Sequence, residues 1–118
     1  MGYPNETGRR LTYRLALAGA FDAAETLAAA KTLTKRDGHF LRFDPDGSAR
    51  DITLPAVTPD DEGDFYVIGN TAGGAENLVI KNAAGSTVVT VNQSEAGVVY
   101  VDSAGAWQVF GVLTYAAS

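Results

Sequence analysis

The chain has no cysteine, one histidine and one tryptophan among its 118 residues. Without cysteine there is neither a disulfide framework nor a thiolate metal site, so stability must come from packing or from assembly. The single imidazole, that of His39, excludes zinc sites that need two histidines and also Cys-His nucleophile pairs. These absences argue against an enzyme, and we expect no catalytic residue, no metal and no cofactor.

Long hydrophobic runs and basic residues are also scarce. No stretch approaches membrane-spanning length, so no membrane partner is expected. The 9 Lys and Arg residues against 14 Asp and Glu give a net charge of −5, which is unevenly placed: residues 1–36 carry +3 and residues 37–118 carry −8. An acidic body repels nucleic acid, and a weakly basic arm does not overcome that repulsion at physiological salt. We therefore expect the arm to seek an acidic protein surface and not a nucleic acid.

The sequence does contain many short β-branched and aromatic runs, each closed by Gly, Asn or Asp. One turn signature recurs three times: an apolar residue, any residue, Asn or Asp, any residue, then Ala-Gly. It occupies residues 68–73, 80–85 and 100–105. Asn and Asp tolerate left-handed backbone angles and bond to their own chain, and Gly accepts a positive φ, so such turns reverse a strand. The repeated turn predicts a β-meander.

The N-terminal region has a different pattern. Residues 1–10 are polar, whereas from Leu11 to Ala18 leucine or tyrosine alternates with other residues at the two-residue period of a strand. This pattern predicts an extended arm over residues 1–20, followed by a single β domain over residues 21–118. At the start of that domain, residues Asp22 to Ala30 include good helix formers after an N-capping aspartate, which allows one short helix.

From His39 onward the sequence predicts a series of strands. The turn Asp44–Gly47 lies between the runs His39–Phe43 and Arg50–Leu54, which predicts a β-hairpin. Further strands are expected at Asp64–Ile68, Asn77–Lys81, Ser86–Val91, Val98–Asp102 and Ala106–Leu113. The fold class is therefore all-β: a small antiparallel β-sandwich or β-tulip-like barrel with an extended N-terminal arm.

The last two of these strands are apolar on both faces, which a small sandwich can cover for only a few strands. The surplus apolar surface is most easily buried against identical copies around a symmetry axis, so we predict a homo-oligomer, most plausibly a trimer. The expected protomer interface contains Val99, Trp107, Val109, Phe110, Val112 and Tyr115. The alternative is that Trp107, Phe110 and Tyr115 fill the core of a monomer, as residues of a central strand do.

Other candidate chemistry has simpler explanations. Asp44, Asp46 and Asp51 are spaced somewhat like a calcium loop, but Pro55 stands where such a loop has its final glutamate, so a solvated turn is the preferred interpretation. No serine lies in a Gly-x-Ser-x-Gly context. Glycan binding is a rival hypothesis, since small β-sandwiches bind sugars through exposed aromatics; the candidates are Tyr66, Tyr100, Trp107 and Tyr115.

From Thr32 onward the strand-and-turn pattern resembles virion proteins of tailed bacteriophages. The resemblance lies in Ile52-Thr53-Leu54-Pro55, in the acidic loop followed by residues 63–70, and in residues 78–80, 85–88 and 106–109. Among such proteins the short, self-contained chain with a basic arm is most similar to the capsid decoration, or cement, proteins, which are β-rich homotrimers. The alternative is a head- or tail-fibre domain that binds a host-surface glycan.

The resemblance implies a structural protein on the outer surface of the phage head, made in the host cytoplasm. Its partners would be other copies of itself and the major capsid protein, and it would stabilise the shell by bridging capsid subunits. The capsid-binding arm would contain Arg9, Arg10, Leu11, Tyr13 and Arg14.

Overall fold

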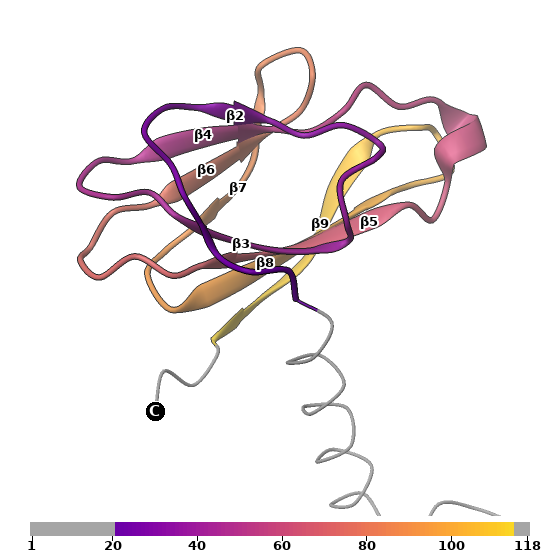
Figure 1. Ribbon diagram of the computed structural model, residues 1–118. Coiled ribbons are helices and arrows are strands. Elements are labelled where there is room, and N and C mark those ends of the chain that lie inside the picture. The colour runs from indigo at the N-terminus through magenta and orange to yellow at the C-terminus, as the bar shows by residue number, and fades with distance from the viewer. Residues whose placement is uncertain (1–20, 115–118) are drawn as a thin grey trace, which may run out of the picture.

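A computed structural model describes residues 21–114 as two β-sheets stacked in two layers, while residues 1–20 and 115–118 lie outside the described part (Figure 1). The five-stranded sheet has the order β1-β3-β5-β8-β9, with β1 (Glu25–Thr26), β3 (Phe40–Asp44), β5 (Phe65–Asn70), β8 (Glu95–Val101) and β9 (Trp107–Thr114). The four-stranded sheet has the order β2-β4-β6-β7, with β2 (Lys31–Thr32), β4 (Arg50–Thr53), β6 (Leu78–Lys81) and β7 (Thr87–Val91). The predicted all-β class and the sandwich are confirmed, but the prediction of antiparallel pairing throughout is wrong, because the two sheets are mixed, and they do not close into a barrel.

The first six strands alternate between the two sheets. Each of the first four strands pairs in parallel with the strand two places later in the sequence, so β1 pairs with β3, β2 with β4, β3 with β5 and β4 with β6. The chain therefore winds around the core in stacked turns, as a short two-sided solenoid does. The last strands instead form antiparallel hairpins, β6 with β7 and β8 with β9, and β5 also pairs antiparallel with β8.

The recurring turn signature makes the same local bond in all three copies. The side-chain Oδ1 atom of Asn70, Asn82 and Asp102 accepts a hydrogen bond from the backbone N–H two residues later, at 2.8, 3.1 and 2.9 Å. The path of the chain after this turn nevertheless differs among the three copies. The copies at Asn82 and Asp102 join the strands of a hairpin and have a following glycine with φ of 93° and 80°, whereas Asn70 begins a crossing to the opposite sheet.

Two predictions for the N-terminal half of the body are wrong. The turn after Asp44 does form, but β3 and β4 lie in different sheets, because Phe43 and Ile52 approach one core from opposite layers. The short helix is absent from the described residues: the alanine-rich stretch contains β1 and leads to β2, and Leu27 and Leu33 are buried in the core. Their burial outweighs the helix propensity of the alanines. The helical turn that is present is a 3-10 segment, Pro59–Asp61.

The core lies between the two layers. Two side-chain hydrogen bonds stabilise it in addition to aliphatic packing. Tyr66 donates its hydroxyl hydrogen to the Thr34 carbonyl at 2.9 Å, and Trp107 Nε1 donates to the Pro55 carbonyl at 2.9 Å. The aliphatic part of the core contains Leu33, Ile52, Leu54, Ile68, Leu78, Ile80, Val91, Val99 and Val101, all at most 1% exposed. Within residues 21–114 there is no helix with the length and apolar character needed to cross a membrane.

Candidate interaction surface

The strand β9 forms one edge of the five-stranded sheet and leaves most of its apolar residues in contact with solvent. It pairs with β8 on one side, and no strand of the described part pairs with its other side. Only its first residue, Trp107, is buried. The exposed fractions of Val109, Phe110, Val112 and Leu113 are 40, 79, 42 and 52%. A long apolar edge strand is a template for pairing with another chain, and soluble monomers usually protect such edges.

A β-bulge directs Phe110 outward. Val99 pairs with Val109 and Val98 pairs with Gly111, so Phe110 is an extra residue between two successive pairs. A bulge of this kind locally re-aims a side chain. The Phe110 ring meets the Tyr100 ring edge to face, with 6.3 Å between the ring centroids and an interplanar angle of 82°. Phe110 is thus held on the face of the sheet that points away from the core.

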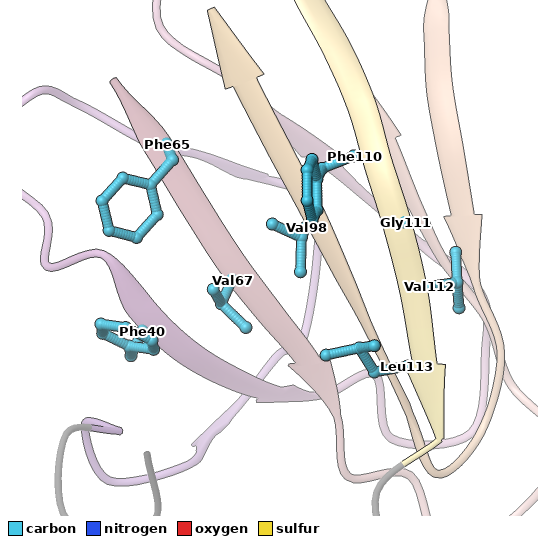
Figure 2. A pocket seen from close by; sticks show the side chains of 8 residues that line it. All are labelled: Phe40, Phe65, Val67, Val98, Phe110, Gly111, Val112 and Leu113. Carbon is cyan, nitrogen blue, oxygen red and sulfur yellow. The ribbon is translucent and has the colours of Figure 1, made fainter. Parts of the chain in front are cut away.

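That outer face carries an apolar groove of about 440 Å³. The residues that line this apolar groove come from four adjacent strands: Phe40, Phe65, Val67, Val98, Phe110, Gly111, Val112 and Leu113 (Figure 2). On β3, β5 and β8 these residues alternate with core residues, as the two-residue period of a strand requires. Phe40 packs edge to face on Phe65 at 5.9 Å. Both sides of this sheet are therefore apolar, but only one side is covered by the second sheet.

The residues expected at the protomer interface divide into three groups. Val109, Phe110 and Val112 are exposed on β9. Val99 and Trp107 are 0% and 9% exposed, so they belong to the core of the chain's own sandwich, and their assignment to an interface is corrected. Trp107 lies against Tyr66, with 5.5 Å between ring centroids. Tyr115 lies outside the described residues, as do all five residues of the expected capsid-binding arm.

His39 occupies a structural position at the border of the groove. Its ring stacks on Phe65 at a centroid distance of 4.5 Å and an interplanar angle of 15°, and Nδ1 lies 2.7 Å from the Phe65 carbonyl oxygen. These contacts use the imidazole as a packing and hydrogen-bonding group on the sheet.

The acidic residues singled out in the sequence bond to their own loops. Asp61 completes a capping box with Thr58, and its carboxylate also binds Lys35 Nζ at 3.1 Å. The hydrogen bond from the Thr58 backbone, followed by the one from Lys35, lowers the pKa of Asp61. Asp44 Oδ1 accepts a hydrogen bond from the Asp46 N–H at 2.9 Å. Within residues 21–114 no three His, Asp or Glu side chains are grouped as a metal site would require.

Of the aromatic residues considered for glycan binding, the three that the structure describes are Tyr66, Tyr100 and Trp107, and two of them are buried. Tyr66 and Trp107 are 5% and 9% exposed, and burial, together with the negative charges of Asp37 and Asp64, raises the pKa of Tyr66 to about 12. Tyr100 is half-buried beside Phe110. Sequence reasoning overlooked the groove-lining residues Phe40, Phe65 and Val67. Their alternation with Leu41, Tyr66 and Ile68 indicates apolar side chains on both faces of β3 and β5.

A scan against protein-family models finds no matching family, and searches of curated proteins and of solved structures find no similar protein.

Proposed function

We propose that this chain is a capsid decoration protein of a tailed bacteriophage, which sits on the outer surface of the head as a homotrimer. The proposal is supported most directly by β9, an edge strand whose Phe110 and Leu113 side chains are 79% and 52% exposed. Fully burying one such side chain contributes about 1.5–3 kcal/mol. Copies of the chain that cover β9 of their neighbours therefore gain substantial free energy, and the identical surfaces suit a closed ring.

The second support is the distribution of charge. The first 36 residues carry +3 and the remainder carries −8. Each copy can thus place Arg9, Arg10 and Arg14 on an acidic capsid surface while its acidic body stays outward. The action is mechanical: a trimer that contacts several capsid subunits adds buried interface to the assembled shell, and binding to the assembled state alone stabilises that state. No covalent step is involved.

Two measurements on the full chain test this function. Light scattering after size-exclusion chromatography should give the mass of a trimer, and the chain should co-sediment with expanded, empty phage heads and raise the temperature at which they rupture. A monodisperse monomer would contradict the oligomer.

A glycan array separates the decoration role from the fibre-domain alternative. That alternative needs exposed aromatics beside polar side chains, and the burial of Tyr66 and Trp107 disfavours it. Retention on a host-surface glycan without binding to heads would overturn the decoration role.

A further inference from the structure

The described chain begins beside the apolar groove. The Phe21 ring packs edge to face on Phe40 at 5.6 Å, and the Asp22 N–H donates to the Phe40 carbonyl at 2.9 Å. Arg42, two residues beyond Phe40 on β3, also holds Phe21 and Asp22: its Nε and Nη2 atoms donate to the Asp22 carbonyl at 3.0 and 2.8 Å, and its guanidinium lies 5.7 Å from the centre of the Phe21 ring. The residues that precede Phe21 are therefore tethered at the β3 end of the apolar groove.

The sequence before Phe21 has apolar residues at alternate positions, which suits the apolar groove, and it is long enough to cross the groove. Residues 11–18 alternate Leu11, Tyr13, Leu15 and Leu17 with smaller or polar residues, and two residues, Gly19 and Ala20, link them to Phe21. Eight extended residues span roughly 26 Å, whereas the distance from β3 across β5 and β8 to β9 is three strand spacings, or roughly 14 Å. The segment is long enough to reach every strand that lines the groove.

We propose that residues 11–18 occupy the apolar groove of their own subunit as an extended segment. Leu11, Tyr13, Leu15 and Leu17 then face Phe65, Val67 and Val98, while Thr12, Arg14, Ala16 and Ala18 face outward. The segment converts an apolar face into a polar one and carries Arg9 and Arg10 to its far end. This inference does not depend on binding to a capsid, although it transfers Leu11 and Tyr13 from the capsid contact to the sheet.

The chain's own segment is favoured over a second copy because of the tether. A segment joined by two residues to the end of the groove has an effective concentration in the millimolar range, far above the concentration of other copies in a dilute solution. A segment that docks on Phe65, Val67 and Val98 also leaves the edge strand β9, with the exposed Phe110, for contacts between copies.

Cysteine pairing tests the placement directly, because the chain has no cysteine of its own. Val98→Cys on the groove floor is combined in turn with a single cysteine at each of residues 12–17, and disulfide formation under mild oxidation is followed on non-reducing gels. We expect intrachain bonds to form about tenfold faster from residues 13, 15 or 17 than from 12, 14 or 16, with the maximum at the residue nearest Val98. Leu15→Cys and Ala16→Cys are a matched pair, since they differ only in the face of the segment.

Equal rates at odd and even positions would overturn the proposal, and bonds formed only between chains would assign the groove to a second copy. Dye binding gives an independent measurement. The double variant Leu15→Ser with Leu17→Ser should increase the fluorescence of anilinonaphthalene sulfonate several-fold while its circular dichroism spectrum remains that of the folded protein, whereas Ala16→Ser with Ala18→Ser should not increase the fluorescence. An unchanged signal in the leucine variant would count against the docked segment.

Discussion

Asn70 is the one fully buried polar side chain among residues 21–114, and all of its hydrogen-bonding groups have partners. Its Nδ2 atom donates to the carbonyls of Glu76 and Val91 at 2.9 and 3.0 Å, and its Oδ1 atom accepts from the Ala72 N–H at 2.8 Å. These bonds tie the crossing from β5 to β6 onto β7 in the opposite sheet. A buried amide with all its partners fixes one arrangement of a loop, because every alternative leaves polar groups unpaired.

Replacing Asn70 by Ala should lower the free energy of unfolding by about 2–4 kcal/mol, since the substitution removes the side-chain partner of three backbone groups, two of them in buried hydrogen bonds. Urea unfolding at neutral pH measures the change. Asn82→Ala is the matched control, because Asn82 makes the same bond to the backbone two residues later but in an exposed hairpin turn; it should lose about 1 kcal/mol. Equal losses in the two variants would show that the interior bonds add nothing.

The raised pKa of Tyr66 predicts that the stability of the folded protein depends on pH in the alkaline range. Its folded pKa is raised to about 12 from a usual value of 10, so the folded state holds the phenolic proton more tightly than the unfolded chain does. The stability that this proton contributes is complete below pH 10 and is lost as the pH rises from 10 to about 12. Tyr66→Phe should be less stable at neutral pH, because the Thr34 carbonyl loses its donor.

The difference in stability between the wild type and Tyr66→Phe should shrink as the pH rises through that window. Chemical unfolding of both proteins from pH 8 to pH 12 measures it. A difference that stays constant over this range would contradict the assigned burial of the hydroxyl.

At the scale of the element, the two hairpin turns that share one signature have different surroundings. Gly85 and Gly105 both adopt a positive φ, of 93° and 80°. A Cβ atom on Gly85 would meet nothing within 4 Å, whereas on Gly105 it would lie 2.5 Å from the backbone of Thr58 and Pro59. The β8–β9 turn is thus packed against the loop that leads to the 3-10 segment.

Gly85→Ala should therefore destabilise the protein by about 1–2 kcal/mol, the cost of a left-handed conformation alone. Gly105→Ala should add a further 1–3 kcal/mol or so from the backbone clash, and should do so by displacing the loop at Thr58. Thermal unfolding of both variants measures the difference. If the two glycines gave equal losses, the close approach of the turn to Pro59 would be refuted.

The exposure of β9 predicts that a charged substitution on this strand dissociates the oligomer. Phe110→Glu should dissociate the oligomer into folded monomers, since Phe110 is 79% exposed within one chain and so contributes little to the fold of a single copy. Light scattering measures the mass and circular dichroism the fold. Thr90→Glu, which adds the same charge at an exposed site on β7, is the control and should keep the oligomer. A Phe110→Glu variant with unchanged mass would remove β9 from the interface.

The bounds of the strands β5 to β9 were predictable from the sequence to within a few residues. The assignment of the earlier strands to one sheet or the other was not. Alternating apolar residues closed by Asx-Gly turns locate β6 to β9, because local bonds decide those hairpins. The turn after Asp44 makes equally local bonds, yet its chain crosses to the other sheet, and only the burial of Phe43 and Ile52 in one core requires this. Tertiary packing, and not turn chemistry, selects between a hairpin and a crossing.

The same limit applies to the interaction surface. Apolar residues on both faces directed attention to β9, but residue type cannot separate Trp107, which is buried beside Tyr66 and Pro55, from Phe110, which a bulge turns outward. Whether a strand lies at the centre or at the edge depends on strand order, which the alternating pattern does not encode. The capsid contact therefore rests on charge and resemblance alone.

At the scale of the whole molecule, the separation of charge between the two ends predicts a salt-sensitive attachment. Deleting residues 1–14 should abolish binding to phage heads while the oligomer stays intact, because the described sandwich from residue 21 to residue 114 does not include them. A finer version changes only charge: Arg9→Ala with Arg10→Ala should weaken binding and flatten its dependence on salt, since fewer screened charge pairs remain.

The control for that variant removes two positive charges from the body instead, through Lys31→Ala with Lys81→Ala. Both lysines form surface ion pairs, with Glu25 and Asp51 at 3.0 Å, and such pairs add little to stability. The two double variants have the same net charge of −7, so a general attraction between the chain and the shell would weaken both equally. Co-sedimentation with empty heads across a series of salt concentrations distinguishes a contact made by the arm from a general attraction. Loss confined to the arginine variant places the contact in the arm, because only the position of the removed charge differs.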